Sequence, residues 1–321
     1  MTSGTKMAPS TDAVPFRIKA RENADLVRHY LEHLKEPMSF DVFPDLRVYD
    51  ELLRQHSGIP LTQARVFEIG VGERPYRLLA LRAMGVDVRG VDAEVPVVRL
   101  SLRALARVYR RNGLERFVKT LVRRSLFDWR DNRAFRQTLT RRGLRMPAHE
   151  PGRVLVADAA ELDLEPGQLD LVYSEDVFEH IAADGLRRLV PRMARWLKPS
   201  GIAVIRPNVF TGITGGHLVE WKPRTLLAPN GRERRTEPWL HLLSEDFKTN
   251  TYLNRLTRAD FRALFSEHFE ILAEDVTLPD LGRDLLTPEL RERLAHYPDE
   301  ELFSNQVRFV LRPRAGGSQP V

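Results

Sequence analysis

Residues 65–76 read RVFEIGVGERPY, a short apolar run that ends in a turn containing two glycines. The run is typical of a buried strand, and the following YRLLALRAMG (76–85) has helical spacing and ends at Gly85. The next segment, VDVRGVDAE (86–94), predicts a second strand that ends in acidic residues. Together these segments predict a β-α-β unit, from which parallel sheets covered by helices are built.

The turn itself narrows the class of ligand. Gly70 and Gly72 stand at its first and third positions, but Pro75 occupies the sixth, where a dinucleotide-binding turn has glycine. The lysine and hydroxyl residue of a P-loop are also missing. The turn therefore favours a nucleoside ligand without a diphosphate. Asp92 ends the second strand 22 residues after Gly70, where its carboxylate can bind two ribose hydroxyls.

The alternation of strands and helices extends over much of the chain. Five further segments have the pattern of strands: 153–158, 169–174, 201–207, 269–277 and 305–313. Five segments have helical spacing: 24–34, 46–56, 97–111, 114–126 and 186–197. A turn is expected at 198–201, and Thr257 with Asp260 predicts a capping box that opens a helix over 256–265.

The composition excludes several classes of chemistry. The 321 residues include no cysteine, which removes disulfides, thiolate nucleophiles and cysteine-ligated metal centres. No apolar run approaches the roughly 18 residues of a transmembrane helix. The N-terminus lacks the apolar core of a signal peptide. We therefore expect a cytoplasmic protein without a transmembrane segment.

Positive charge is concentrated between Pro96 and Glu150. This segment has 15 Arg or Lys residues against four acids, a local excess of +11, although the whole chain carries +6. Such a block predicts contact with an anionic partner, for example phosphate, acidic glycan, nucleic acid or a membrane surface. The alternative is an ordinary set of amphipathic helices whose arginine side chains cover apolar surface without any partner.

The sequence resembles the class I S-adenosylmethionine-dependent methyltransferases over roughly residues 60 to 210. Four segments in the family's order carry the resemblance: VFEIGVG (66–72), GVDAE (90–94), VADAAEL (156–162) and LDLVYSEDVFEHI (169–181). It implies an α/β, Rossmann-like fold with a mainly parallel seven-stranded sheet. In this chain an N-terminal helical extension, a helical insertion after the second strand and a C-terminal cap would be added to it. The sequence departs from the family at ERPY (73–76), where the family has a further glycine.

The resemblance also implies which residues bind S-adenosylmethionine. Glu68, Gly70 and Gly72 would lie beside the methionine moiety, and Asp92 would bind the ribose. Asp158 and Ala159 would flank the adenine, and Ser174 would stand at the mouth of the fourth strand.

These patterns divide the chain into five predicted parts. They are a disordered lead-in (1–15), an N-terminal helical segment (16–59), a cofactor-binding core (60–212) with a basic helical insertion (96–150), an acceptor-binding cap with the last strands (213–312), and a disordered tail (313–321).

The stretch SEDVFEHI (174–181) contains candidate catalytic groups. Asp176, Glu179 and His180 have the spacing i, i+3 and i+4, which would place them on one face of a helix, with Glu175 pointing elsewhere. Many class I methyltransferases have a similar Glu-His pair without a metal, where the histidine packs or touches the substrate. The structural and the functional interpretation both stay open on this stretch alone.

A second segment, RPNVFTGITGGHLVEW (206–221), adds a resemblance to the small-RNA 2′-O-methyltransferases. Those enzymes bind a divalent ion through an E-x-x-E-H helix and a later histidine, and the ubiquinone-pathway O-methyltransferases use a similar element. The resemblance implies metal ligation by Asp176, which replaces the first glutamate, and by Glu179, His180 and His217. Two oxygen and two nitrogen ligands would tolerate Mg²⁺, Mn²⁺, Fe²⁺ or Zn²⁺.

We therefore expect an S-adenosylmethionine-dependent O-methyltransferase that acts on a hydroxyl of a saccharide, glycolipid or other polyhydroxy metabolite. A metal would lower the pKa of the hydroxyl. Without a metal, His180 or His217 would act as general base, oriented by a carboxylate such as Glu179. One alternative is an RNA ribose 2′-O-methyltransferase that uses the basic insertion. Another is a non-catalytic scaffold that only binds the cofactor.

Overall fold

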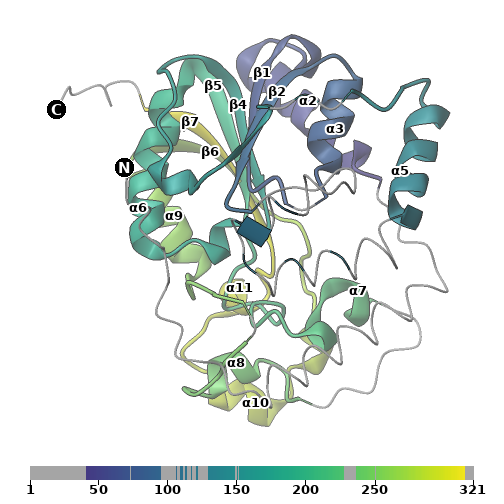
Figure 1. Cartoon of the computed structure of the whole chain (residues 1–321). Helices are drawn as coiled ribbons and strands as arrows, with labels where there is room; N and C mark the ends of the chain where they lie inside the picture. Colours follow the sequence, from purple (N-terminus) through teal and green to yellow (C-terminus); the bar gives the residue numbers. More distant parts are fainter. Residues whose placement is uncertain are drawn as a thin grey trace.

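The computed structural model describes residues 41–72, 74–94, 129–148, 150, 152–227, 236–249 and 251–314, with a few isolated residues between 106 and 121. A seven-stranded sheet in the order β3-β2-β1-β4-β5-β7-β6 forms the centre of the molecule (Figure 1). Its strands are β1 (Arg65–Ile69), β2 (Asp87–Asp92), β3 (Val154–Val156), β4 (Leu169–Glu175), β5 (Leu197–Arg206), β6 (Phe269–Val276) and β7 (Val307–Pro313). The first five strands pair in parallel, and β7 is antiparallel to both β5 and β6. The predicted fold class is confirmed.

Alternating side chains of the strands face opposite sides of the sheet, as the period of two of a strand requires. Val66 and Phe67 are both buried, but Val66 belongs to the apolar cluster on one face and Phe67 to the cluster on the other. Both faces are therefore covered, which explains why the strands read as continuous apolar runs rather than alternating ones.

Two groups of helices cover these faces (Figure 1). α2 (Phe43–Ser57), α3 (Tyr76–Ala83) and α5 (Trp129–Arg141) pack on the Val66 side, and α6 (Ala183–Trp196) and α9 (Arg258–Ser266) on the Phe67 side. The predicted capping box of α9 is present, because the Thr257 hydroxyl accepts from the Asp260 amide at 3.0 Å and the Asp260 carboxylate accepts from the Thr257 amide at 2.9 Å. α2 ends at Gly58, which has a left-handed φ of 71°.

Within the basic insertion, the structure describes α5 in full. Phe135 of α5 stacks on Tyr76 of α3 with ring centroids 4.6 Å apart, and Arg74 pairs with Asp131 at 2.9 Å. The insertion is thus anchored on the helix that follows the glycine turn. The predicted helices at 97–111 and 114–126 lie outside the described residues, apart from isolated positions.

A separate apolar cluster forms the centre of the segment that follows β5. It includes Ile213, Trp221, Trp239, Leu290 and Leu302, all buried. The short helices of this segment are α7 (Pro223–Leu226), α8 (Leu240–Leu243), α10 (Pro288–Arg293) and α11 (Asp299–Leu302), and in Figure 1 they lie below the sheet. We call residues 213–227, 236–249 and 279–303 the cap.

Two local predictions are corrected. Residues 198–201, expected as a turn before β5, lie inside it as a bulge: Leu197 pairs with Leu169 and Ile202 already pairs with Leu171. Pro313, which the sequence placed both at the end of the strand 305–313 and at the start of the tail, belongs to β7 and pairs with Phe269. The lead-in 1–15, the helix 24–34 and residues 315–321 lie outside the described residues. Within the described part of the chain, no helix is long and apolar enough to cross a membrane.

Candidate active site

The residues expected to bind the cofactor follow the carboxyl ends of neighbouring parallel strands. Glu68 lies in β1, Asp92 ends β2, Asp158 comes directly after β3, and Ser174 lies near the end of β4. Because these strands are parallel, their carboxyl ends meet at one edge of the sheet, where open α/β sheets bind ligands.

The glycine turn fits tightly against the segment after β4. Gly70 has a φ of 79°, and a Cβ atom there would lie 2.2 Å from a methyl group of Val177. Gly72 has a φ of 69°, and its amide donates to Oδ2 of Asp92 at 2.6 Å. The other Asp92 oxygen accepts from the Glu94 amide at 2.8 Å. The turn thus fixes the carboxylate that is expected to bind the ribose.

Glu68 is a buried carboxyl with an unpartnered oxygen. It is 4% exposed, and its Oε2 has no hydrogen-bond partner among the described residues. Burial raises the pKa of Glu68 to about 8, and the positive charge of Arg77 opposes the rise. At pH 7 this carboxyl is therefore mostly protonated.

Asp158 and Ser174 make local contacts at the same edge. Oδ1 of Asp158 accepts a hydrogen bond from the Ala160 amide at 2.9 Å. Asp158 thus caps the 3₁₀ turn Ala159–Glu161. The Ser174 hydroxyl, 1% exposed, donates to the Ile69 carbonyl at 2.9 Å. Ser174 therefore ties β4 to β1, where the sequence suggested a side chain at the open mouth of the strand.

The SEDVFEHI stretch is not an α-helix, and this prediction was wrong. Asp176 has a φ of 57°, which breaks the chain direction after β4, and only Phe178–His180 form a 3₁₀ turn. Oδ1 of Asp176 accepts hydrogen bonds from the side-chain amides of Asn208, at 3.0 Å, and Gln306. Asp176 therefore does not join the other three expected metal ligands.

Glu179, His180 and His217 do come together. One ligand atom from each lies within 4.8 Å of the others. Nε2 of His217 is 3.8 Å from Oε1 of Glu179, and the two imidazole rings lie 4.9 Å apart, nearly perpendicular. His217 reaches this position with a left-handed φ of 56°. Left-handed backbone at non-glycine residues is costly and clusters at functional sites.

Surrounding residues hold these three side chains in place. Nδ1 of His180 lies 2.9 Å from the Tyr252 carbonyl; because a carbonyl only accepts, Nδ1 carries the proton and Nε2 keeps a free lone pair. The Asn208 side chain donates to Oε1 of Glu179 at 2.7 Å. Asn254 donates from its backbone amide to the Glu179 carbonyl at 2.9 Å.

Two buried atoms of the cluster have no hydrogen-bond partner among the described residues, Oε2 of Glu179 and Nε2 of His217. Burial and the nearby Asp176 raise the pKa of Glu179 to about 8. Burial and the charges of His180 and Lys222 lower the pKa of His217 to about 3, and burial also lowers that of His180. Both histidines are therefore neutral at pH 7, the state in which imidazole binds metals.

Three residues of this site escaped the sequence reasoning: Gln306, Asn254 and Lys222. Gln306 and Asn254 reach the site from distant parts of the chain, so no local spacing marks them. Asn208 was noted only as part of the segment that leads to His217.

Comparison with known proteins agrees with this arrangement. Residues 132–205 match the family described as a methyltransferase domain. Among curated proteins, no sequence matches the chain significantly. The family match supports a methyltransferase domain in this part of the chain, and the order of the seven strands agrees with a Rossmann-like fold for it.

Several solved structures are similar at low sequence identity. The PH0226 protein of Pyrococcus horikoshii is 15% identical, with 86% of this chain and 92% of that chain covered and a TM-score of 0.43. An S-adenosylmethionine-dependent methyltransferase of Mesorhizobium loti is 17% identical, with coverages of 84% and 96% and a TM-score of 0.40. Phosphoethanolamine N-methyltransferase 2 of Haemonchus contortus is 19% identical, with coverages of 83% and 52% and a TM-score of 0.41.

Proposed function

We propose that this enzyme methylates a hydroxyl group of a saccharide, a glycolipid or another polyhydroxy metabolite at the cluster of Glu179, His180 and His217. The observation that carries the proposal is the pair of buried, unpartnered atoms, Oε2 of Glu179 and Nε2 of His217, beside a histidine of fixed tautomer. Unpartnered buried polar atoms are costly, so a ligand that supplies their partners would be strongly favoured.

The reaction requires an in-line arrangement of acceptor and donor. The acceptor oxygen forms a bond to the methyl carbon while the carbon–sulfur bond breaks, and S-adenosylhomocysteine leaves. Most of the catalysis is therefore positioning. The hydroxyl proton must also leave, and Nε2 of His217 is an available acceptor for it. A base whose pKa is about 3 is weak for this task, so the imidazole alone gives little assistance.

The same three side chains fit a divalent cation better than they fit a lone base. Two neutral histidines and one carboxylate, with the second nitrogen of His180 hydrogen-bonded to a carbonyl, form a common ligand set with open positions. A bound divalent cation would act as a Lewis acid that lowers the pKa of a coordinated hydroxyl. In this proposal Glu179, His180 and His217 hold the ion, and Asn208 orients the Glu179 carboxylate. Asp176 supports Asn208 from the other side.

The test is methyl transfer from labelled S-adenosylmethionine to fractionated cell extract, before and after treatment with EDTA. We expect label in a carbohydrate or small-molecule fraction, loss of labelling with EDTA, and recovery with one of Mg²⁺, Mn²⁺, Fe²⁺ or Zn²⁺. Labelling that is insensitive to EDTA would exclude the metal and leave His217 as base. Label on nitrogen or carbon in the isolated product would overturn hydroxyl methylation.

One observation favours RNA as a second candidate acceptor. Arg133, Arg136, Arg141 and Arg145 of the basic insertion are exposed, and no ion pair with another described residue is found for them. RNA binding that weakens steeply between about 50 and 200 mM salt would support this candidate. Absence of binding at the lower salt concentration would exclude it.

A further inference from the structure

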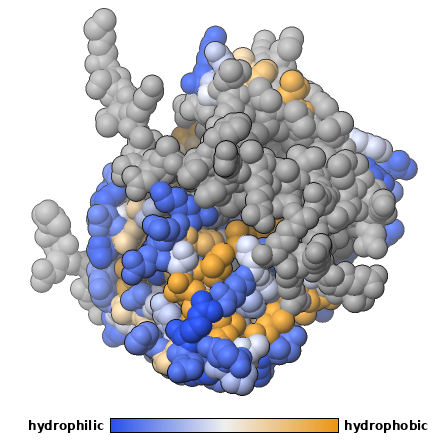
Figure 2. Space-filling view, turned by 90° about the horizontal axis from the view of Figure 1, so that it is seen from below, coloured by the Kyte–Doolittle hydropathy of each residue, from blue (hydrophilic) through white to orange (hydrophobic). Residues whose placement is uncertain are grey.

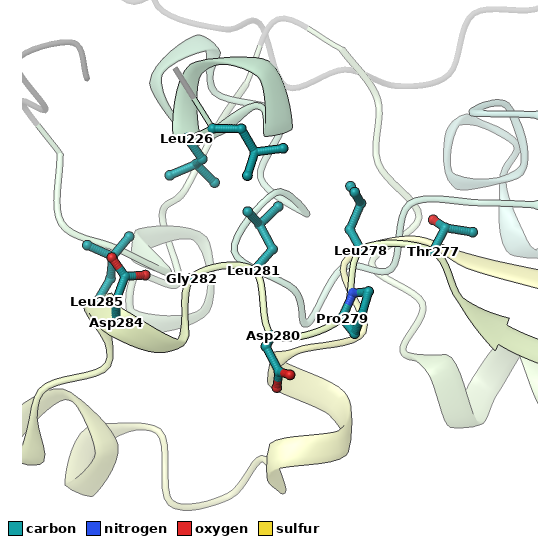
Figure 3. A pocket seen from close by; sticks show the side chains of 10 residues that line it. Leu226, Thr277, Leu278, Pro279, Asp280, Leu281, Gly282, Asp284 and Leu285 are labelled. Atoms are coloured by element: carbon teal, nitrogen blue, oxygen red, sulfur yellow. The ribbon is translucent and has the colours of Figure 1, made fainter. Parts of the chain in front are cut away.

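A cavity lies between the end of α7 and the segment that follows β6. It has a volume of about 420 Å³, and its apolar lining consists of Leu226, Leu227, Leu278, Pro279, Leu281 and Leu285. We call these six residues the leucine pocket. Figure 3 shows that Leu226, from α7, faces Leu281, and that Leu278 rises beside the same space. A cavity of this size suits part of a small molecule rather than a macromolecule.

Six of the ten residues that line the pocket are apolar, and the others are two aspartates, a threonine and a glycine. Asp280 points away from the leucines in Figure 3 and pairs with Arg283 at 2.7 Å. The Thr277 hydroxyl donates to Oε1 of Gln306 at 2.9 Å, so its polar group is already bonded. Asp284 is exposed. The apolar part of the lining can therefore pack against a hydrocarbon.

The pocket adjoins the site along two paths. Gln306, which accepts from Thr277 at the pocket, donates through its side-chain amide to Asp176. Helix α7 begins directly after Lys222, five residues beyond His217 in the chain, and ends at Leu226 in the pocket. Four helical residues rise about 6 Å. Asp176 and Glu179 both accept hydrogen bonds from Asn208, so side chains in direct contact connect the wall of the pocket to the cluster.

The surface around this end of the molecule is also apolar in part. The view from below in Figure 2 shows apolar side chains at the surface, framed by polar ones. Leu227 is 65% exposed, so its side chain is accessible to a ligand.

We propose that the leucine pocket binds an aliphatic chain of the methyl acceptor. The acceptor would then be an amphiphile, with a hydroxylated head at Glu179, His180 and His217 and a hydrocarbon chain in the pocket. This inference rests on the proposed function, and among the acceptors named there it selects the lipid-linked ones.

The probe is n-octyl β-D-glucoside below its micelle-forming concentration, with methyl β-D-glucoside as the matched ligand that lacks the chain. Binding to the full chain with bound S-adenosylhomocysteine is followed by ligand-observed NMR titration. Every two methylenes that become buried should tighten binding about tenfold. We therefore expect the octyl glucoside to bind at least about 100-fold more tightly than the methyl glucoside.

Two pocket variants and one control locate the binding. Leu281→Asp, at a half-buried position, and Leu227→Asp, at an exposed one that should not disturb folding, should each weaken octyl glucoside binding at least about tenfold. Leu121→Asp, at an exposed leucine outside the pocket, should leave it unchanged. S-adenosylhomocysteine affinity should be the same in all three variants.

The outcomes distinguish failure of the proposed ligand pocket from failure of the proposed methylation reaction. Two results would overturn the proposal that the pocket binds an aliphatic chain, even if hydroxyl methylation is established. One is equal affinity for both glucosides, and the other is octyl glucoside binding that Leu227→Asp does not weaken. Octyl binding that both pocket variants weaken would support the pocket. If such binding is found but labelled S-adenosylmethionine methylates no hydroxylated acceptor, the proposed function fails instead.

Discussion

The Tyr49 hydroxyl of α2 donates a hydrogen bond to the Glu175 carboxylate at the end of β4, across 126 residues of sequence. The other carboxylate oxygen pairs with Arg206 at the end of β5. The Tyr49 ring also lies 4.9 Å from the ring of Tyr173. α2 is therefore bound by a buried polar contact to the strand that leads into the active site.

Replacing Tyr49 should destabilise the fold. Tyr49→Phe keeps the ring packing but removes one donor from a buried carboxylate, which should cost about 1–3 kcal/mol of unfolding free energy. Urea unfolding measures the loss. Tyr252→Phe, at a tyrosine that is 40% exposed, is the control and should change stability by less than about 0.5 kcal/mol. Equal stability of Tyr49→Phe and the native protein would show that the bond contributes nothing.

Asp92 should be essential for cofactor binding but not for folding. Asp92→Ala removes the expected ribose acceptor and also releases the amides of Gly72 and Glu94. The variant should lose the two charge-assisted hydrogen bonds to the ribose hydroxyls. We therefore expect an affinity for S-adenosylmethionine at least about 100-fold lower, measured by calorimetry. Asp87→Ala, at the opposite end of β2 with its carboxylate paired to Arg153 at the surface, is the control. Unchanged affinity of Asp92→Ala would refute the ribose assignment.

Glu68 should make stability depend on pH. Its pKa is raised to about 8 in the folded protein, so between pH 4.5 and 8 the unfolded chain has lost a proton that the folded chain still holds. The contribution of protonated Glu68 to the free energy of unfolding is therefore present at low pH and is lost as the pH rises toward 8. Glu68→Gln has no proton to lose at this position. The free energy of unfolding of the variant, relative to that of the native protein, should therefore increase by a few kcal/mol between pH 5 and pH 8. The same difference at both values, in urea unfolding, would contradict the raised pKa.

The cluster residues should affect turnover more than cofactor binding. Glu179→Gln keeps an oxygen for the Asn208 amide but removes the carboxyl group that can ionise and bind a cation, and His217→Ala removes the unpartnered nitrogen. We expect kcat to fall at least about 100-fold with S-adenosylmethionine affinity within about threefold of native. His296→Ala, at an exposed histidine, should change neither. Parallel losses of kcat and affinity would indicate that the cluster only maintains the fold.

Local sequence patterns predicted most of the fold. The apolar run before Gly70, the capping box at Thr257 and the acidic end of β2 are formed by neighbours in the chain, so each could be predicted directly. Helical spacing misled at Asp176, because a left-handed residue leaves the i, i+3, i+4 pattern intact in the sequence while it destroys the shared face. The bulge at 198–201 depends on pairing with β4, which local residues do not encode.

The active site also contains some residues that the sequence predicts and others that it does not. Glu179, His180 and His217 could be named because a motif and a later histidine pointed to them. The Tyr252 carbonyl that fixes the tautomer of His180 is a backbone group, and any residue could supply it. Gln306 reaches Asp176 across 130 residues and has no motif of its own. Contacts of this kind depend on tertiary packing, and a single sequence contains no record of them.

The position of β7 between β5 and β6 has a consequence for biosynthesis. Because the strand inserted between them is the last of the seven to be synthesised, β5 and β6 cannot be joined in one sheet before β7 has been made. Gln306 directly precedes that strand, so the hydrogen bond that holds Asp176 also forms late. A nascent chain can therefore assemble the glycine turn early, well before Asp176 acquires its partner.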